Sequence, residues 1–243
     1  MDLQRKRRVD ASSALPIRNK MGAVEEFVMA DYVEGVDTNR FRRKRLAQFL
    51  NRIRHLTENQ DRIALIDIGG TISYWRSMQD LWQDLPLDIT IVNLDVPESD
   101  DGPFHIRSGN ACALSGYPDR SFDVAHSNSV IEHVGTWQNM VAMAGEIRRI
   151  AQLYYVQTPN FWFPIEPHYR TPFFQMCPEN MRARMLLRKK RGFRGPHSSL
   201  DAAMRDVQSV ALLDYGQMSA LFPDAKIERE KVMGLTKSLI ASR

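Results

Sequence analysis

The sequence predicts an α/β fold, an open and mostly parallel sheet that holds a ligand at one edge. Residues 63–70 form an apolar run of strand length that ends in an acid, Asp67, and two glycines. Residues 89–95 form a second, β-branched run that also ends in an acid, Asp95. Buried parallel strands are continuous apolar runs, and glycines after such a strand let a ligand approach the main chain. We therefore expect a ligand over the carboxyl edge of the sheet.

Length and composition favour one large α/β domain with appendages. The chain has 243 residues, of which 43% are hydrophobic and 26% are charged. No apolar run approaches the ~18 residues that a membrane span requires, and no apolar segment of a secretory signal follows the basic residues 5–8. Cys112 and Cys177 fit no metal or disulfide framework, which indicates a reducing compartment. The expected location is the cytoplasm.

The N-terminal region is expected to be an arm followed by a basic helix, residues 1–56, ahead of the main domain at 57–243. A helical pattern covers residues 40–56, with Asp37 or Thr38 as its cap and an apolar face of Leu46, Phe49, Leu50 and Ile53. The other face is basic. It is either a solvated face or a contact with an anionic surface, and the sequence leaves both open.

The remaining elements follow from periodicity and turn signals. A helix after Thr71 should bury Trp75, Met78, Trp82 and Leu85 and end at Pro86. The acidic stretch 97–103 should be a loop. Further strands are expected at 104–111, 122–126, 153–158, 226–233 and 237–242, and further helices at 178–190 and 215–221. One more helix is expected to begin after its cap Thr136. Its apolar face consists of Trp137, Met140, Val141, Ala144 and Ile147.

The glycine pattern excludes two common nucleotide sites. The dinucleotide fingerprint Gly-x-Gly-x-x-Gly is absent, and so is the Gly-Lys-Ser/Thr of a Walker loop. An acid at the end of the second strand, as at Asp95, can accept hydrogen bonds from both ribose hydroxyls of an adenosine. Asp95 is therefore placed to hold the ribose of a ligand that contains an adenosine.

Two motifs resemble the class I S-adenosylmethionine (SAM) methyltransferases, type 11-like. Residues 65–70, Leu-Ile-Asp-Ile-Gly-Gly, resemble the family's Leu-Asp-Ile-Gly-x-Gly-x-Gly and depart from it at Thr71 and Ser73. Residues 114–135 contain Ser-Phe-Asp-Val-Ala-His-Ser-Asn-Ser-Val-Ile-Glu-His-Val. This run is similar to the family's Ser-Phe-Asp-Val-Val-x-Ser-x-x-Val-Leu-Glu-His-Val. The resemblance covers roughly residues 63–160.

The resemblance implies a Rossmann-like mixed sheet, mostly parallel with an antiparallel last strand, helices on both faces and an N-terminal helical extension. It also implies SAM as cofactor. The family's third strand often ends in Gly-Asp-Ala, where the acid contacts the adenine amino group; here Asn110 takes that place and offers its side-chain oxygen. The cofactor-binding residues that the resemblance implies are Asp67, Gly69, Gly70, Thr71, Asp95, Asn110, Ala111 and Ser127.

The segment after the fifth strand is unusually aromatic, and we expect the methyl acceptor there. Aromatic rings offer rigid surfaces for the C–H faces of sugars, so Phe161, Trp162 and Tyr169 are the candidate substrate contacts, within an acceptor-side insertion at about 161–205. A lid that packs on itself is the alternative. The run Thr-Pro-Asn-x-Trp-x-Pro-x-Glu-Pro-His resembles methyltransferases of saccharide and glycolipid pathways. In size and type the chain is similar to rhizobial enzymes that 2-O-methylate the fucose of a nodulation signal.

The expected reaction is methyl transfer to a hydroxyl group, a poor nucleophile that a nearby base would activate. His168, in the aromatic segment, is the first candidate base and His133 the second; Glu132 and Glu166 are weaker ones. No cluster of ligands in the sequence suggests a metal, so none is expected. Alternatives are a small-molecule or quinone-type acceptor and a non-catalytic SAM- or RNA-binding module.

A second basic segment at 178–190 leaves the partner open. A lipid-linked, phosphorylated acceptor at an anionic membrane surface would explain both basic helices. Nucleic acid would also explain them, but no RNA-binding motif accompanies them, so it is not expected. The sequence does not indicate an oligomeric state.

Overall fold

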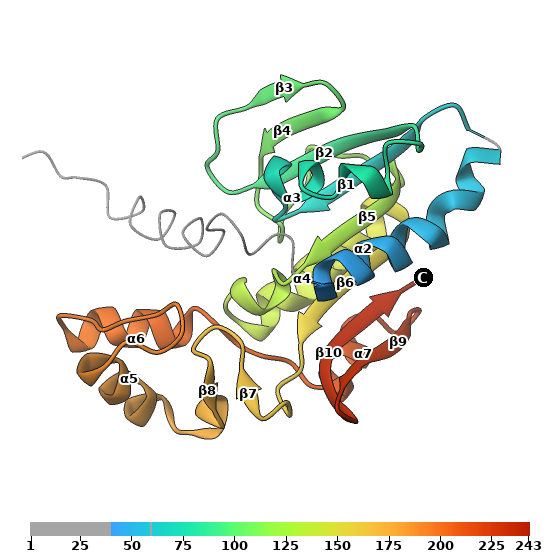
Figure 1. Cartoon of the computed structure of the whole chain (residues 1–243). Coiled ribbons are helices and arrows are strands. Elements are labelled where there is room, and N and C mark those ends of the chain that lie inside the picture. Colours follow the sequence, from blue (N-terminus) through green and yellow to red (C-terminus); the bar gives the residue numbers. More distant parts are fainter. Residues whose placement is uncertain (1–39, 59) are drawn as a thin grey trace, which may run out of the picture. The chain divides into compact units, whose positions relative to one another are not determined.

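The computed structural model describes residues 40–58 and 60–243 (Figure 1). These residues belong to one compact unit, Glu34–Arg243. The basic residues 5–8 and the expected helix caps Asp37 and Thr38 lie outside the described residues.

The core of this unit is an eight-stranded sheet in the order β3-β4-β2-β1-β5-β6-β10-β9. Strands β4, β2, β1, β5 and β6 are mutually parallel, whereas β10 and β9 close one side and β3 the other in antiparallel pairs. The expected Rossmann-like mixed sheet is thereby confirmed. The strands are β1 (Ile63–Ile68), β2 (Leu87–Asn93), β3 (Ser99–Asp101), β4 (Phe104–Ser108), β5 (Phe122–Asn128), β6 (Ala151–Pro159), β9 (Lys226–Val232) and β10 (Leu235–Ser242).

The order of the strands marks where a ligand fits. From β1 the chain winds outward through β2 to β4, and it then returns to the other side of β1 through β5 and β6. Such a reversal separates the connections above two adjacent strands and opens a crevice outside their carboxyl ends. The crevice predicted by this topology lies between β1 and β5.

The described helices are α2 (Arg40–Ile53), α3 (Ile72–Arg76), α4 (Trp137–Ile150), α5 (Glu179–Arg188), α6 (Leu200–Gln208) and α7 (Tyr215–Leu221). Short 3₁₀ turns are η2 (Arg54–Glu58), η3 (Gln79–Leu81), η4 (Ile131–His133) and η5 (Phe174–Met176), and β7 (Ile165–Glu166) pairs with β8 (Thr171–Pro172). Within residues 40–58 and 60–243, no helix combines the length and apolar character that a bilayer span needs.

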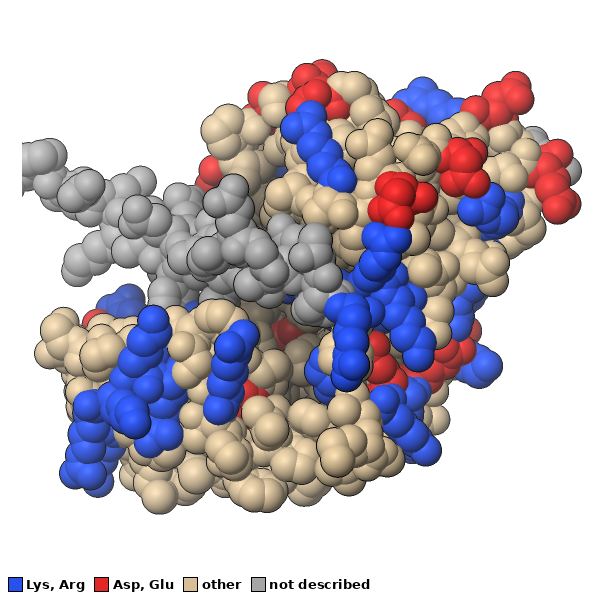
Figure 2. Space-filling view, viewed as in Figure 1, with Lys and Arg blue, Asp and Glu red and all other residues tan. Residues whose placement is uncertain are grey.

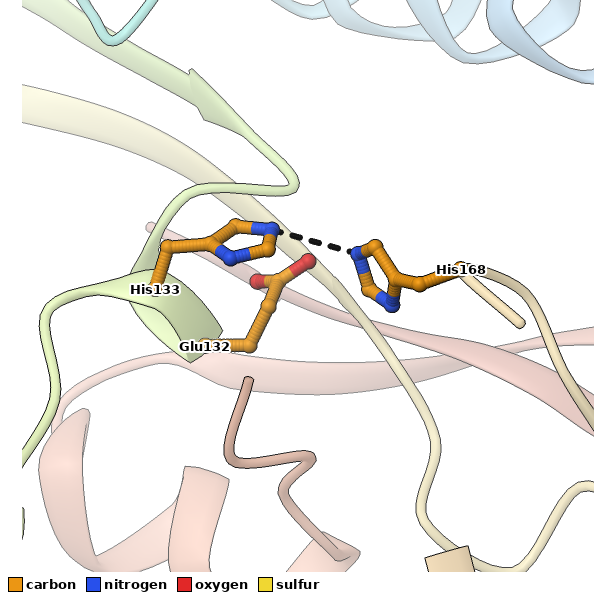
Figure 3. A group of neighbouring side chains, drawn as sticks. All are labelled: Glu132, His133 and His168. Atoms are coloured by element: carbon orange, nitrogen blue, oxygen red, sulfur yellow. Dashed lines mark hydrogen bonds between the residues drawn. The ribbon is translucent and has the colours of Figure 1, made fainter. Parts of the chain in front are cut away.

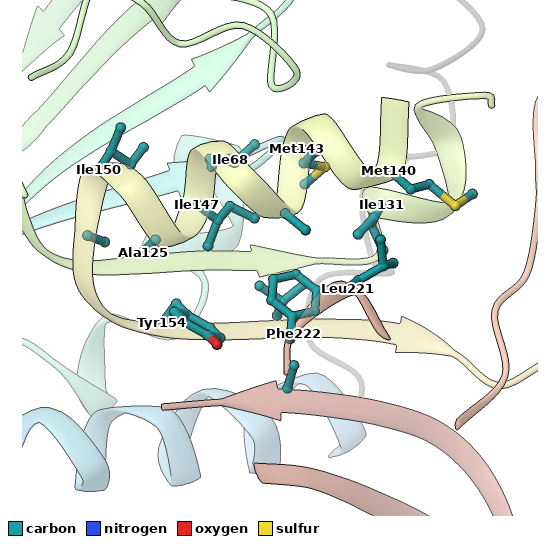
Figure 4. Packing of buried hydrophobic residues seen from close by; sticks show 14 of the residues in the cluster. Ile68, Ala125, Ile131, Met140, Met143, Ile147, Ile150, Tyr154, Leu221 and Phe222 are labelled. Carbon is teal, nitrogen blue, oxygen red and sulfur yellow. The ribbon is translucent and has the colours of Figure 1, made fainter. Parts of the chain in front are cut away.

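Alternate residues of the strands build two separate cores, because successive side chains of a strand point to opposite faces. One face packs on α4 and α7 through a cluster that includes Ala125, Ile147 and Phe222 (Figure 4). The other face packs on α2 and the segment around α3, and it includes Val124, Phe49 and Trp75. Helices on both faces were expected, and so was the buried face of α2. The predicted domain boundary at residue 56 stays a prediction, but α2 belongs to the core of the sheet.

Several expected elements differ from the structure. Strands β2 and β4 end at Asn93 and Ser108, and not at 95 and 111 as expected. The acidic stretch 97–103, expected to be a loop, contains β3, which pairs with β4. In α4 the cap Thr136 is confirmed, because its side chain accepts a hydrogen bond from the Asn139 amide. The buried face of α4 is shifted, however: Trp137 and Val141 are exposed.

The helix after Thr71 is much shorter than expected. Trp75, Met78, Trp82 and Leu85 are all buried as predicted, but α3 ends at Arg76. The Trp82 indole N–H donates to the main-chain oxygen of Trp75, 2.9 Å away. The Ser77 hydroxyl similarly donates to the Tyr74 carbonyl. These side chains take carbonyls that a longer helix would use, and the segment continues as a 3₁₀ turn.

The chain between β6 and α7 forms a small cluster of its own. Apolar side chains from the segment after β7 and from η5, α5 and α6 pack together, namely Tyr169, Phe174, Ala183, Leu186, Ala203 and Val207. A buried ion pair supports them, because the Arg194 guanidinium lies 3.3 Å from the Asp206 carboxylate. This cluster fixes the segment that carries His168.

Candidate functional site

The glycine turn lies at the carboxyl end of β1, beside the predicted crevice. The Gly69 amide donates to the Val92 carbonyl (2.9 Å), and the Asn93 side-chain amide donates to the Gly70 carbonyl (2.8 Å), so the turn is tied to β2. Gly69 has a φ of +77°, in the left-handed region, and a Cβ atom there would lie 2.4 Å from a methyl group of Val130. The turn therefore packs directly against the loop that follows β5.

The side chain of Asp67 supports this glycine turn. Its carboxylate is buried and accepts hydrogen bonds from the Trp75 indole N–H (2.7 Å) and from Nδ1 of His126 (2.8 Å). A Cβ atom on Gly70 would lie only 1.8 Å from this carboxylate. Both oxygens of Asp67 thus serve bonds within the chain. The residue supports the turn, and direct contact with a cofactor stays a prediction.

The other predicted cofactor residues lie at the carboxyl ends of adjacent parallel strands. Asp95 is exposed, two residues beyond β2, and has a φ of +49°. The Asn110 side-chain oxygen accepts from the Cys112 amide, and Ala111 beside it is half-buried. The hydroxyl of Ser127, buried in β5, donates to the Ile68 carbonyl and joins β5 to β1.

Thr71 completes the set at the start of α3. Its side chain caps this helix by accepting a hydrogen bond from the Tyr74 amide. The ends of β1, β2, β4 and β5 meet at one edge because these strands are parallel. The eight predicted cofactor residues therefore lie in or just beyond the carboxyl ends of these four strands, and their contact with a cofactor stays a prediction.

Glu132, His133 and His168 come together beyond this edge (Figure 3). Glu132 and His133 belong to η4, immediately after β5, and His168 lies two residues after β7. The Nε2 atoms of the two histidines are 3.1 Å apart. Glu132 is fully buried, and one of its oxygens accepts from the Thr158 hydroxyl at 2.9 Å. Glu132 and His133 are neighbours in one motif and His168 belongs to another segment, and the fold brings the two segments together.

The partners of the imidazoles define where their protons lie. Nδ1 of His133 lies 3.0 Å from the Ser209 carbonyl oxygen, which can only accept, so this nitrogen donates. Nδ1 of His168 lies 2.7 Å from a Glu166 oxygen and donates likewise. The other Glu166 oxygen accepts from the Tyr169 amide. Both Nε2 atoms consequently face each other.

Burial and neighbouring charges shift the pKa values of the two histidines in opposite directions. Burial, assisted by the charge of His168, lowers the pKa of His133 to about 3. Burial also acts to lower the pKa of His168, but the hydrogen bond and charge of Glu166 outweigh it, and the pKa is raised. Burial raises the pKa of the Glu132 carboxyl. In the chain alone, His168 therefore donates from Nε2 to the neutral His133.

The three predicted acceptor contacts differ in exposure. Trp162 is 63% exposed and packs edge-on against the Phe161 ring, with 5.1 Å between centroids. Trp162 also lines a hollow of about 270 Å³ together with Tyr215 and Arg229. Tyr169, in contrast, is 1% exposed, and its hydroxyl donates to Asp206. Tyr169 thus belongs to the small core behind the site and offers an acceptor almost no surface.

Several supporting residues escaped the sequence analysis. Thr158 and Ser209 orient the cluster through one side-chain and one main-chain oxygen. The buried Asp206 carboxylate forms hydrogen bonds with the Tyr169 hydroxyl and with Nε2 of His197 (2.5 Å), and an ion pair with Arg194. Thr158 begins the aromatic run quoted above, whereas the other residues stand in no motif. The roles of all of them depend on contacts between distant segments.

No family model matches the chain, and no curated protein matches it. Among solved structures, it is similar to a putative methyltransferase from an antibiotic biosynthesis pathway of Anabaena variabilis. Identity is 15% over 76% of this chain and 64% of that one, with a TM-score of 0.45.

Two further structures are similar at the same level. A putative O-methyltransferase of Nostoc punctiforme shares 12% identity over 83% of this chain and 55% of that one, with a TM-score of 0.46. A SAM-dependent methyltransferase of Methanosarcina mazei shares 13% identity over 77% of this chain and 96% of that one, with a TM-score of 0.44. The chain thus spans less than two thirds of the length of the first two, and similarity this low identifies neither an activity nor a cofactor.

Proposed function

We propose that the chain is a SAM-dependent methyltransferase that methylates a hydroxyl group of a saccharide-type acceptor. The observation that carries the proposal is the contact between Gly69 and Val130. It joins the glycine turn to the loop that bears Glu132 and His133 two and three residues later. A cofactor over the turn would thus have its reactive end beside a pair of half-buried histidines.

The residues present fit SAM. The turn offers main chain without side chains, because both of its residues are glycines. Another residue would not fit, since a Cβ at Gly69 would collide with Val130 and a Cβ at Gly70 with Asp67. The exposed carboxylate of Asp95 suits ribose hydroxyls, which donate hydrogen bonds. The methionine end of SAM would lie at Gly69 and Gly70, and bound SAM supplies an electrophilic methyl group on a positively charged sulfur. Motif resemblance and the reversal of strand order between β1 and β5 support this placement.

The remaining predicted cofactor residues would either contact the adenosine or support the shape of the site. Asn110 and the Ala111 main chain would flank the adenine at the end of β4. Ser127, Thr71 and Asp67 act on the shape of the site, because each is bonded to neighbouring chain. Their part is to keep the ends of β1 and β5 and the start of α3 in place.

The histidine pair is placed to activate the acceptor. The acceptor oxygen bonds to the methyl carbon while the carbon–sulfur bond breaks, and the bonding electrons leave with the sulfur. In the form of His168 that carries no proton on Nε2, the hydroxyl proton passes to this nitrogen, whose basicity Glu166 increases through the hydrogen bond to Nδ1. His133 holds the other side of His168 at 3.1 Å. Positioning of the three reacting atoms in line is the other requirement.

Exposed aromatic surface favours a saccharide over other acceptors. Trp162 and Phe161 present adjoining rings on the segment between β6 and β7, the same stretch of chain that leads to His168. A sugar ring stacks through its C–H face on such a surface. The narrowest form of the proposal is 2-O-methylation of a fucose in a nodulation lipo-oligosaccharide. A quinone-type or other small acceptor is the alternative, and direct competition between acceptors would separate them.

A cationic surface around α5 supports a lipid-linked acceptor. Lys and Arg side chains gather over α5 and the turn after it, at the lower left of Figure 2. The exposed cations there are Arg184, Arg188, Lys189 and Lys190. By contrast, several cations of α2 form ion pairs within the chain, such as Arg52 with Glu228 and Arg45 with Glu230. We propose that α5, rather than α2, contacts an anionic membrane surface.

Isothermal calorimetry with SAM, followed by transfer of a radiolabelled methyl group to a panel of saccharides, tests the proposal. Binding of one SAM per chain and label on a fucosylated oligosaccharide are expected. Binding without transfer to any saccharide, quinol or catechol would favour the non-catalytic module. Absence of SAM binding would contradict the proposal altogether.

A further inference from the structure

We propose that Glu132, His133 and His168 bind a divalent metal ion. The ligand atoms of the three side chains lie within 4.8 Å of one another. They come from two segments, η4 and the chain after β7, that the fold brings together. No metal was expected, because no cluster of ligands is visible in the sequence; His133 and His168 are 35 residues apart.

The orientation of both imidazoles is the first argument. Ligating histidines typically donate their other ring N–H to a carboxylate or a main-chain carbonyl, which fixes the ring and its tautomer. His133 donates from Nδ1 to the Ser209 carbonyl, and His168 donates from Nδ1 to Glu166. Each ring therefore turns Nε2 toward the same point (Figure 3).

The spacing of the two nitrogens is the second argument. Metal–nitrogen bonds to histidine are about 2.0–2.1 Å long. Two nitrogens 3.1 Å apart would then subtend an angle of about 100° at the metal. That angle lies between those of octahedral and tetrahedral sites. The pair thus needs little rearrangement to share one ion.

The buried carboxylate is the third argument. One oxygen of Glu132 accepts from the Thr158 hydroxyl, whereas the other, Oε1, has no hydrogen-bond partner among the residues that the structure describes. The side chain is fully buried and lies between the two rings. An oxygen left in this state is costly, and a cation held directly or through one of its waters would satisfy it.

The charges around the cluster are compatible with a cation. Glu166 places a second carboxylate directly behind His168. Arg194 is the opposing charge, and Asp206 lies 3.3 Å from its guanidinium. The cluster therefore combines two carboxylates with two imidazoles, the donors that first-row divalent metals such as Mn²⁺, Co²⁺ and Zn²⁺ accept.

Three ligands from the chain leave coordination positions open, as in catalytic rather than structural sites. Resting on the proposed function, we assign one open position to the acceptor hydroxyl, whose pKa a divalent cation would lower. The histidines then act as ligands, and the cation takes over the activation that is otherwise given to His168. The hydroxyl proton leaves to water.

Cobalt(II) absorption tests the site without reference to catalysis. The full chain is freed of metal with a chelator, desalted and titrated with Co²⁺ while the visible absorption is recorded. One Co²⁺ per chain is expected. Glu132→Gln and His133→Ala should each weaken binding at least about 100-fold, because removal of a ligand costs no less than removal of its outer partners. His55→Ala, an exposed histidine on η2, is the matched control and should bind as the wild type does.

Each outcome decides the proposal. Glu132→Gln keeps the shape of the side chain and an acceptor for Thr158, so it remains informative if His133→Ala fails to fold. Absence of Co²⁺ binding, or equal binding by the wild type and Glu132→Gln, would overturn the metal site. SAM calorimetry on the same samples separates the two claims: retained SAM binding without Co²⁺ binding removes only the metal. Co²⁺ binding without SAM binding removes the proposed function and leaves the metal.

Discussion

Nε2 of His133 lies 3.1 Å from Nε2 of His168, although the residues are 35 positions apart in the sequence. Each ring is fixed from behind through Nδ1, His133 by the Ser209 carbonyl and His168 by Glu166. Neither ring can turn away without the loss of a buried hydrogen bond. The loop after β5 and the segment after β7 therefore form one chemical unit, and the candidate site depends on their contact.

His168→Ala should lower the turnover rate and leave SAM affinity unchanged. Loss of a general base typically costs ~10²–10⁴-fold in rate, and loss of a metal ligand acts on the same step. Turnover at saturating SAM and calorimetry measure the two quantities, with His55→Ala as control. Near-normal turnover in His168→Ala combined with lost turnover in His133→Ala would transfer the role to His133.

Asp95→Ala should weaken SAM binding by about tenfold or more. The loss of a charge-assisted hydrogen bond typically costs ~1.5–3 kcal/mol, and every ~1.4 kcal/mol is a factor of ten in affinity. Calorimetry checks the change, and Asp201→Ala, an exposed acid on α6, is the matched control. If both variants bind SAM equally well, another group holds the ribose.

Trp162→Ala should raise the Michaelis constant for the acceptor and have little effect on the turnover rate. The side chain is 63% exposed, so its removal leaves the core intact and takes away a surface for the acceptor. Steady-state kinetics with varied acceptor measure both constants. Leu235→Ala removes a comparably exposed apolar side chain at the start of β10 and should change neither. An unchanged Michaelis constant in Trp162→Ala would place the acceptor elsewhere.

His105 should make the stability of the chain depend on pH. Its ring nitrogens lie 2.7 Å from Asp100 and 2.8 Å from Asp88, and the hydrogen bonds to Asp100 and Asp88 raise its pKa. The stabilisation is complete below the unfolded-state pKa of about 6.5 and is lost as the pH rises through the raised folded-state pKa. Urea unfolding across this range should show a decline that His105→Gln flattens. An identical decline in both proteins would assign it to other groups.

Asp206→Ala should strongly destabilise the small cluster behind the site. The carboxylate is buried and binds Arg194, His197 and the Tyr169 hydroxyl, so its removal leaves a buried arginine without this partner. Breaking a buried ion pair typically costs ~3–5 kcal/mol. Urea unfolding measures the loss, with Asp201→Ala as control. A change below about 1 kcal/mol would show that the cluster does not depend on this pair.

The sequence predicted the central strands β1, β2, β5 and β6 because they are apolar runs with clear ends. It also predicted two strands at the positions of β9 and β10, and Gly234 between them has a φ of +83°. Strand β3 was missed because Ser99–Asp101 is short, acidic and fully exposed, and its partner β4 alone makes it a strand. The length of α3 was missed because tertiary hydrogen bonds from Trp82 and Ser77, which have no local pattern, end it.

The sequence indicated which residues belong to the candidate site, but it did not indicate that they lie in contact. A motif indicated Glu132 and His133, and position after the fifth strand indicated His168. Their meeting depends on the path of residues 161–208, which the buried pair of Arg194 and Asp206 helps to set. Long-range pairs of this kind leave no periodicity in the sequence. For the same reason the unpaired oxygen of Glu132, on which the metal proposal rests, could not be foreseen.

Hydrogen–deuterium exchange with and without SAM shows both whether the cofactor binds and where it binds. Slower exchange is expected at the ends of β1, β2, β4 and β5, around Gly69, Asp95, Asn110 and Ser127, and in the loop that carries His133. Exchange at α5 should not change. No protection at the glycine turn, or protection confined to the surface around α5, would show that SAM does not bind at this edge of the sheet.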